Sequence, residues 1–284
     1  MANLIGEQTV LVTGANAGIG RATSTELARL GARVLMACRD AERGAEARAA
    51  VSDLMPGART ELLLADLSTG DGVRSLAEQT RQLTDRLDVL VNNAGVFTRK
   101  FTPTADGLET QFAVNHLAPF LLTNLLRDLL ARSAPARVVT VSSEAHKRGQ
   151  IRFDDLQGEQ NYSGMKAYSQ SKLANLLFNR ELARRLGGTG VTANALHPGV
   201  IATELLFTGF APIRLLRPFL KTPESGARTS VFLAVAPAVE RLTGLYFIDL
   251  EPARPSQAAR DDGAARRLWR ISAELTGIDP EENS

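Results

Sequence analysis

A tyrosine and a lysine lie four positions apart in the run Tyr168-Ser169-Gln170-Ser171-Lys172, within a pattern that predicts a helix over 165–186. Side chains at this spacing share one face of a helix. A free tyrosine titrates near 10, and a cation close by favours the phenolate and lowers that pKa. The pair therefore suits a general acid/base that moves a proton between an alcohol and a carbonyl. Chance produces such a pair about one time in twenty, so other motifs must support this interpretation.

A glycine-rich turn, Thr13-Gly14-Ala15-Asn16-Ala17-Gly18-Ile19-Gly20, joins an apolar run at 9–12 to an amphipathic pattern at 19–30. Strand, glycine turn and helix together can cradle a phosphate, because glycines let the backbone approach the anion and the helix amides point at it. The spacing Gly-x-x-x-Gly-x-Gly differs from the commoner Gly-x-Gly-x-x-Gly. The turn predicts a nucleotide phosphate site, with a simple tight connection between strand and helix as the alternative.

Strand-like apolar runs alternate with helical patterns, and strands are expected at 9–12, 32–37, 61–65, 87–91, 137–141, 191–196 and 245–248. Helices are expected at 19–30, 40–54, 69–83, 107–132 with an interruption at Pro119, and 165–186. This alternation predicts an α/β fold, a doubly wound parallel sheet of Rossmann type with about seven strands and helices on both faces. Because no linker or repeat divides the chain, residues 1–284 are expected to form a single dinucleotide-binding and catalytic domain.

Residues that could do chemistry follow the predicted strands at the points where these end. Ligands of such sheets bind beyond the carboxyl ends of the strands, so these residues should share one edge of the sheet. They are Gly14, Cys38, Arg39, Asp66, Asn92, Asn93, Ser142, Ser143, His197, Pro198 and Gly199.

Two segments depart from the alternation. Residues 203–220 are strongly apolar and follow a strand end, which suits a lid over an apolar substrate; a helix packed on the core and an amphipathic segment touching a membrane are the alternatives. Residues 256–275 predict a helical extension on the outside of the sheet, with a buried stripe that includes Leu268 and Trp269.

Composition excludes several classes of function. The net charge of +2 is too small to favour nucleic acid as the main partner. A single cysteine, Cys38, excludes an internal disulfide, and the three histidines lack neighbours at metal-ligand spacing, so no metal is expected. Neither a secretory signal nor an apolar run of membrane-spanning length is visible, which predicts a soluble, cytoplasmic protein.

The motifs occur in the order that is typical of the short-chain dehydrogenase/reductase family, and the resemblance covers residues 7 to 250. They are Thr13-Gly14-x-x-x-Gly18-x-Gly20, Asn92-Asn93-Ala94-Gly95, Asn115, Ser143, Tyr168-x-x-x-Lys172 and Pro198-Gly199. Further phrases resemble the retinol-dehydrogenase-like branch, whose members act on lipophilic alcohols and carbonyls. These phrases are Met36-Ala37-Cys38-Arg39-Asp40, Ser142-Ser143-x-Ala145-His146, His197-Pro198-Gly199 and Leu268-Trp269.

The resemblance implies a role for each catalytic candidate. Tyr168 would be the general acid/base, and Lys172 would lower its pKa and hydrogen-bond the nicotinamide ribose. Ser143 would hold the substrate oxygen, with Ser142 as the competing candidate. Asn115 would position a water that links Lys172 to solvent, or would simply be a satisfied polar residue within a helix.

The resemblance also implies a cofactor site. Asp66 would accept a hydrogen bond from the adenine amine, or cap the following helix. The residues expected to contact the cofactor are Gly14, Asn16, Ala17, Gly18, Ile19, Gly20, Arg39, Asp66, Leu67, Asn93, Ala94, Gly95, Tyr168, Lys172, Pro198, Gly199, Val200 and Thr203.

Cofactor preference depends on the end of the second strand. NAD-specific relatives usually carry an acid there, whereas this chain has Cys38 followed by Arg39. A guanidinium suits a 2′-phosphate, which predicts NADP(H). Asp40 lies close by, so NAD(H) stays open as an alternative.

These inferences predict an NADP(H)-dependent oxidoreductase that interconverts an alcohol and a carbonyl on a lipophilic small molecule, acting as a carbonyl reductase. The alternatives are a cofactor-binding sensor or scaffold with little turnover, and an epimerase or dehydratase of the same fold. A homo-oligomer paired through the helices at 107–132 and 165–186 is a further expectation that the resemblance implies.

Overall fold

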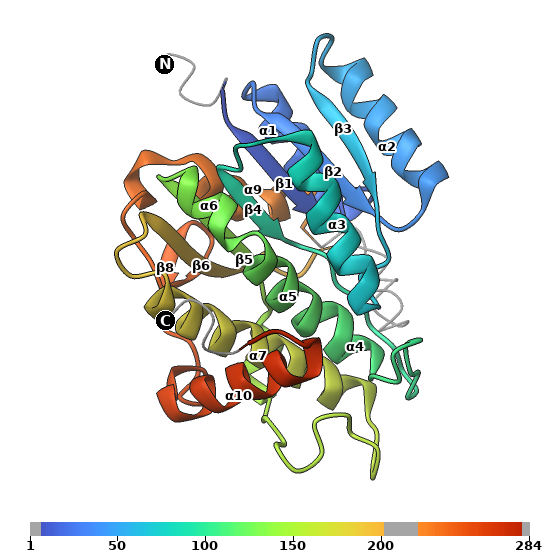
Figure 1. Cartoon of the computed structure of the whole chain (residues 1–284), viewed down its shortest axis with the longest axis vertical. Helices are drawn as coiled ribbons and strands as arrows, with labels where there is room; N and C mark the ends of the chain where they lie inside the picture. Colours follow the sequence, from blue (N-terminus) through green and yellow to red (C-terminus); the bar gives the residue numbers. More distant parts are fainter. Residues whose placement is uncertain (1–6, 202–220, 280–284) are drawn as a thin grey trace.

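Eight strands form one sheet at the centre of this computed structural model, which describes residues 7–201 and 221–279 (Figure 1). Their order is β3-β2-β1-β4-β5-β6-β7-β8, and every pair is parallel except β7 with β8. The strands are β1 (Thr9–Thr13), β2 (Arg33–Cys38), β3 (Thr60–Leu64), β4 (Val89–Asn92), β5 (Ala136–Val141), β6 (Val191–His197), β7 (Tyr246–Ile248) and β8 (Glu251–Ala253). The strand order reverses beside β1, which creates a crevice at the carboxyl ends of β1 and β4.

Helices cover both faces of the sheet, which confirms the predicted doubly wound α/β fold. The helices are α1 (Gly18–Arg29), α2 (Ala41–Leu54), α3 (Gly70–Leu83), α4 (Thr110–Phe112), α5 (Ala118–Leu125), α6 (Arg127–Arg132), α7 (Gly164–Arg185), α9 (Pro223–Val235) and α10 (Asp262–Thr276). Shorter turns are the π-helical η1 (Ala113–Leu117) and the 3-10 turns η2 (Glu144–Arg148), η4 (Pro237–Val239) and η5 (Ala258–Arg260).

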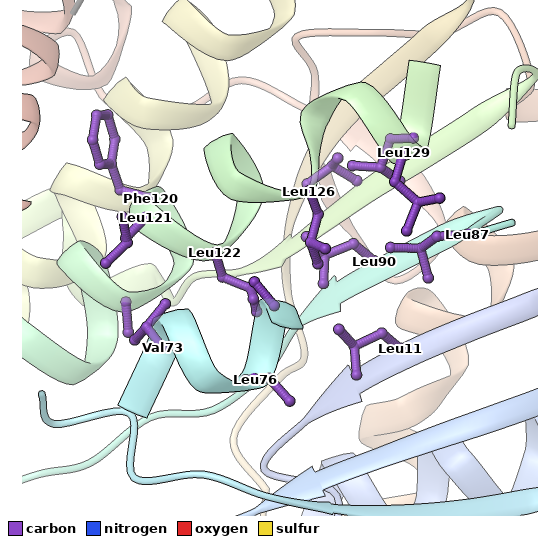
Figure 2. Close-up of a cluster of buried hydrophobic side chains, with 14 of the residues drawn as sticks. Leu11, Val73, Leu76, Leu87, Leu90, Phe120, Leu121, Leu122, Leu126 and Leu129 are labelled. Atoms are coloured by element: carbon purple, nitrogen blue, oxygen red, sulfur yellow. The ribbon is translucent and has the colours of Figure 1, made fainter. Parts of the chain in front are cut away.

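Alternating side chains of the buried strands divide the core into two layers. Val10 and Val12 pack among side chains of α1, α2 and α9, whereas Leu11 points to the layer of α3, α5 and α6. Figure 2 shows the second layer, where Leu76 of α3 and Leu122 of α5 meet the sheet. Because both faces are covered, the strands are apolar throughout rather than alternating.

Three elements differ from the sequence-based expectation. The helix predicted over 107–132 begins at Thr110 and has an additional break at Leu126, whereas the interruption predicted at Pro119 is confirmed, since α5 begins there after η1. The helix α9 and the strand β8 were not predicted. β8 has only three residues and contains Pro252, which lacks an amide donor and suits an edge strand. The predicted lid at 203–220 lies outside the described residues.

The helix α10 lies against α7 and α5, and Figure 1 shows it beside α7. Trp269 of α10 stacks on Phe178 at 5.9 Å between ring centres, and meets Phe120 edge-on at 4.8 Å. The Arg185 guanidinium lies 4.6 Å from the indole centre. α10 therefore covers surfaces of the two helices through which pairing was expected. Over 7–201 and 221–279, no helix has the length and apolar character needed to cross a bilayer.

Candidate active site

The glycine turn after β1 has the shape of an anion cradle. Gly14 and Gly18 have positive φ angles of +66° and +51°, which side chains disfavour, and a Cβ on Gly20 would lie 2.1 Å from the Gly14 carbonyl oxygen. No side chain caps α1 at Ala17, whereas Asp40 caps α2 and its carboxylate accepts from a backbone amide there. The amide groups that begin α1 are therefore available to a phosphate.

The end of β2 is followed by an exposed cation. Arg39 is exposed at this edge of the sheet. The Asp40 carboxylate instead accepts a hydrogen bond from the Arg43 amide at 2.9 Å and caps α2. Asp40 is therefore engaged by its own helix.

The next two strand ends carry Asp66 and Asn93. The Asp66 carboxylate accepts from the Ser68 amide at 3.0 Å, while Thr69 is the residue that caps α3, so Asp66 stabilises the turn without capping the helix. Asn93 fastens β4 to β1, because its side-chain amide donates to the Thr13 carbonyl at 2.8 Å. Leu67 and the stretch from Ala94 to Gly95 are half-buried beside these residues.

Tyr168 and Lys172 lie on α7, with the Lys172 Nζ 5.6 Å from the centre of the phenol ring. Lys172 is only 3% exposed, and its ammonium donates to the Val141 carbonyl at 3.2 Å. Burial raises the pKa of Tyr168 to about 12, partly opposed by a hydrogen bond involving the Ser143 side chain. Burial also lowers the pKa of Lys172 to about 8.

These directions differ from the expectation that the lysine lowers the tyrosine pKa. The spacing did bring the two side chains to one face of α7, but the ammonium is directed at the carbonyl of Val141. Removal of both groups from water therefore dominates, since it disfavours the charged form of each. Spacing along a helix fixes proximity, whereas the direction of a pKa shift also depends on burial.

The hydroxyl groups of Ser142 and Ser143 have different partners. Ser142 is buried, and its hydroxyl donates to the Lys172 carbonyl at 2.7 Å. Ser143 is half-buried beside Tyr168, and its hydroxyl oxygen accepts from the Ala145 amide at 3.2 Å. Of the two, Ser143 is the one whose hydroxyl faces the tyrosine.

Asn115 lies in the π-helical turn η1, a kind of turn that is frequent at functional sites. Its amide nitrogen donates to Ser171 at 3.0 Å and to the Val96 carbonyl at 3.1 Å, and its oxygen accepts from the Val96 amide at 2.7 Å. The Ser171 hydroxyl in turn donates to the Tyr168 carbonyl at 2.8 Å. Asn115 is thus a well-satisfied polar residue that ties η1 to the helix of the tyrosine.

The loop after β6 continues the same edge. Gly199 has a φ of +95°, and a Cβ there would lie 3.1 Å from the Lys221 side chain. Pro198 is half-buried, and Val200 is 50% exposed. Thr203, the last residue expected at this end, lies outside the described residues.

Two neighbours of the site were not foreseen. The Phe97 ring meets the Tyr168 ring edge-on at 5.7 Å between centres, and Lys221 pairs with Asp249 at 2.6 Å across the loop of Gly199. Phe97 follows the Asn93-Ala94-Gly95 run by two positions, the only local signal for it. Lys221 carried no signal, because the chain brings it back from elsewhere in the sequence.

Comparisons with known proteins agree with this geometry. The short chain dehydrogenase family profile matches residues 8–209. Retinol dehydrogenase 14 of Mus musculus is 48% identical over an alignment of 289 residues, gaps included, which covers 95% of this chain and 86% of that protein. The crystal structure of an uncharacterised protein from Mycobacterium paratuberculosis superposes with a TM-score of 0.78 at 38% identity, covering 96% of this chain and 94% of that one.

A Pseudomonas aeruginosa RhlG/NADP active-site complex has a TM-score of 0.70 at 29% identity, covering 86% of this chain and 94% of that one. The family profile spans the glycine turn, the serine pair and the Tyr–Lys pair, and the similarity to retinol dehydrogenases extends over nearly the whole chain. The chain is a member of the short-chain dehydrogenase family and belongs to its retinol-dehydrogenase-like branch, and it is an NAD(P)-dependent oxidoreductase that acts on CH–OH donors.

Proposed function

We propose that this protein is an NADP(H)-dependent oxidoreductase that reduces the carbonyl group of a lipophilic small molecule to an alcohol. One observation carries the proposal: the Ser143 hydroxyl and the Lys172 ammonium flank the Tyr168 phenol at the sheet edge where the glycine turn opens. A proton donor, a hydrogen-bonding hydroxyl and a cation at one place are what carbonyl reduction requires.

Each side chain of this site has a distinct role in the proposal. NADPH, when bound at the glycine turn, supplies the hydride for the carbonyl carbon. Tyr168 donates its phenolic proton to the carbonyl oxygen, and Ser143 holds that oxygen by a hydrogen bond. Lys172 stabilises the phenolate that remains after the proton has left, because its ammonium lies within a few ångströms of the ring. Asn115 holds the helix of the tyrosine in place through Ser171.

The preference for NADP(H) rests on Arg39. Its guanidinium is exposed at the end of β2 and matches a 2′-phosphate in charge and geometry, whereas the nearby Asp40 is engaged as the cap of α2. The RhlG/NADP complex, a structural neighbour, also supports a phosphorylated cofactor.

The substrate class rests on Phe97 and on the relatives. Phe97 gives the approach to Tyr168 an aromatic wall, and the names of the similar proteins refer to retinol, a lipophilic alcohol.

The proposed location is the cytoplasm. The single cysteine, Cys38, is buried and free, which suits the reducing environment there.

A substrate and cofactor matrix tests the proposal. The purified protein is assayed with NADPH and with NADH against all-trans-retinal, a steroid ketone, an aromatic aldehyde and, as a polar control, a ketose sugar. We expect turnover of lipophilic carbonyls with a kcat/KM at least tenfold higher for NADPH than for NADH. Equal efficiency with both cofactors would refute the role of Arg39, and turnover of the sugar alone would refute the substrate class.

A further inference from the structure

Two histidines that the proposed chemistry does not use connect the active site to the end of the chain. His146 and His116 are both buried, at 0% and 1% exposure. Each lies beside a residue of the proposed site, three positions after Ser143 and one position after Asn115. Each makes a hydrogen bond to the segment 256–276, which lies beyond the part of the chain that the family profile matches.

The hydrogen bonds of His146 fix its protonation state. Its Nε2 accepts from the Ser256 amide at 3.2 Å, so that nitrogen carries no proton. Its Nδ1 lies 2.7 Å from the Ser143 carbonyl oxygen, which can only accept, so Nδ1 must carry the proton. Burial lowers the pKa of His146, and the Tyr246 ring packs against it edge-on at 5.1 Å between centres. His146 is therefore a neutral ring with one defined tautomer.

This ring holds the backbone of Ser143 in place. The Ser143 carbonyl accepts from both the His146 side chain and the His146 amide, the latter at 3.1 Å. The Ser143 hydroxyl oxygen accepts from the Ala145 amide, and the same side chain hydrogen-bonds the Tyr168 phenol. With the carbonyl held and the hydroxyl bonded on both sides, the position of the Ser143 side chain is set by the turn η2 and by His146.

His116 forms a parallel connection. Its Nε2 lies 2.8 Å from the Ser272 hydroxyl of α10, and the rings of Phe112, Phe120 and Phe178 surround it. Burial lowers its pKa to about 3, so this ring is also neutral. The π-helical turn that carries Asn115 is thus connected to α10 through His116. In the same way, the loop of Ser143 is connected to Ser256 through His146.

We propose that the segment 256–276 is a positioning element of the active site, which acts on Ser143 through the neutral His146 side chain. The inference rests on the proposed role of Ser143 as the residue that holds the substrate oxygen. The Nδ1–H group of His146 fixes the Ser143 carbonyl, and the Ser256 amide fixes the His146 tautomer. His146 itself touches neither the substrate nor the cofactor, and the link through His116 steadies the neighbouring turn.

Three substitutions at one position separate the two hydrogen bonds. In His146→Asn the amide nitrogen replaces Nδ1 and can still donate to the Ser143 carbonyl. In His146→Gln the amide oxygen replaces Nε2 and can still accept from Ser256, while His146→Phe keeps only the packing. We expect kcat for carbonyl reduction to fall about tenfold or more in the Gln and Phe variants, as the loss of one aligned hydrogen bond implies. The Asn variant should stay within about threefold of the wild type.

Binding and stability measurements distinguish positioning from a general structural role. NADPH affinity, measured by fluorescence titration, should be unchanged in all three variants, and KM should change less than kcat. If kcat instead follows the thermal stability of the variants, with Asn as impaired as Phe, the positioning role is refuted.

A matched pair at Ser256 tests the other end of the connection. Ser256→Pro removes the amide that donates to His146, whereas Ser256→Ala keeps that amide and removes only the hydroxyl that accepts from the Ala259 amide. We expect the Pro variant to lose activity to the same extent as His146→Gln or more, and the Ala variant to keep it. Equal activity of the Pro variant and the wild type would overturn the proposal.

An activity-independent readout completes the test. In the ¹⁵N-histidine-labelled full chain, the resonances lost in His146→Phe should have the shifts of a neutral ring protonated on Nδ1 from pH 6 to 8. An Nε2–H tautomer or a protonated ring would refute the connection.

Tyr168→Phe serves as the reference for the proposed function. If it is as active as the wild type, the proposed function fails; if it is inactive while His146→Gln and His146→Phe keep full kcat, only the positioning role fails.

Discussion

The nucleotide end and the catalytic end of the sheet edge are built differently. At the nucleotide end, Arg39 and Asp66 are exposed, and their surroundings are arranged by local bonds such as those of Asp40 to Arg43 and Asp66 to Ser68. At the catalytic end, Lys172 and His146 are buried and bond to distant parts of the chain. The surroundings of Arg39 and Asp66 are therefore arranged by short motifs, and those of Lys172 and His146 also by contacts across the fold.

This difference has an energetic consequence. A polar group at the exposed end can exchange its partner for water at little cost, whereas a buried one that loses its partner keeps the full cost of desolvation. Substitutions of buried groups at the catalytic end should thus lower turnover or stability more than substitutions of exposed groups at the nucleotide end.

Loss of the phenol should have the largest effect. In Tyr168→Phe, kcat for carbonyl reduction should fall by about 10²–10⁴-fold, because the proton donor is gone while the ring that Phe97 packs against remains. NADPH affinity, measured by fluorescence titration, should change less than about twofold. A variant that retains more than a tenth of the wild-type kcat would place the acid/base elsewhere.

Loss of the indole that packs α10 against α7 and α5 should follow. Trp269→Ala removes a ring that packs on Phe120 and Phe178, and should lower the free energy of unfolding by about 3–5 kcal/mol in urea denaturation. The control Leu54→Ala at the last residue of α2, where the side chain is 69% exposed, should cost less than about 0.5 kcal/mol. Similar losses in both variants would contradict the contrast between buried and exposed side chains.

A smaller effect is expected for the exposed cation. Arg39→Ala should lower the ratio of kcat/KM with NADPH to that with NADH by about 10–100-fold, since the charge-assisted bonds to the 2′-phosphate are lost. The folded state should keep its stability. The control is Arg48→Ala, which removes an exposed arginine on α2 and should leave the ratio unchanged. An unchanged ratio in the Arg39 variant would mean that another group selects the cofactor.

The last effect concerns stability in acid. Because burial lowers the pKa of His116 to about 3, the unfolded chain binds a proton at this residue below pH 6.5 while the folded chain does not. The free energy of unfolding should therefore decrease as the pH falls from 6.5 towards 3, with this residue contributing up to about 1.4 kcal/mol per pH unit. His116→Gln, which can still bond Ser272, should have a shallower slope in chemical denaturation series. Identical slopes would show that His116 becomes protonated in the folded state.

The contrast also explains what the sequence could predict. The glycine turn, the Tyr–Lys pair and the strand ends are local patterns, and they led to the right fold and to one edge of the sheet. Pro119, which has no amide donor, also indicated the interruption beside η1, whereas strand β8 is too short to have a pattern.

The supports of the catalytic end could not be predicted in the same way. Their partners are 31 residues apart for Lys172 and Val141, and 110 apart for His146 and Ser256. The direction of the Tyr168 pKa shift depends on burial and on where the ammonium points, and neither is visible in the spacing of the two residues.

Transfer of deuterium is the most direct test of the central claim that the protein moves a hydride to a lipophilic carbonyl. The protein is incubated with all-trans-retinal and with NADPH deuterated at one or the other of the two C4 positions, and the alcohol product is analysed by mass spectrometry. We predict that one of the two cofactors delivers one deuterium to the carbinol carbon, and that Tyr168→Phe forms almost no product. An alcohol that forms without deuterium from either cofactor would contradict the account.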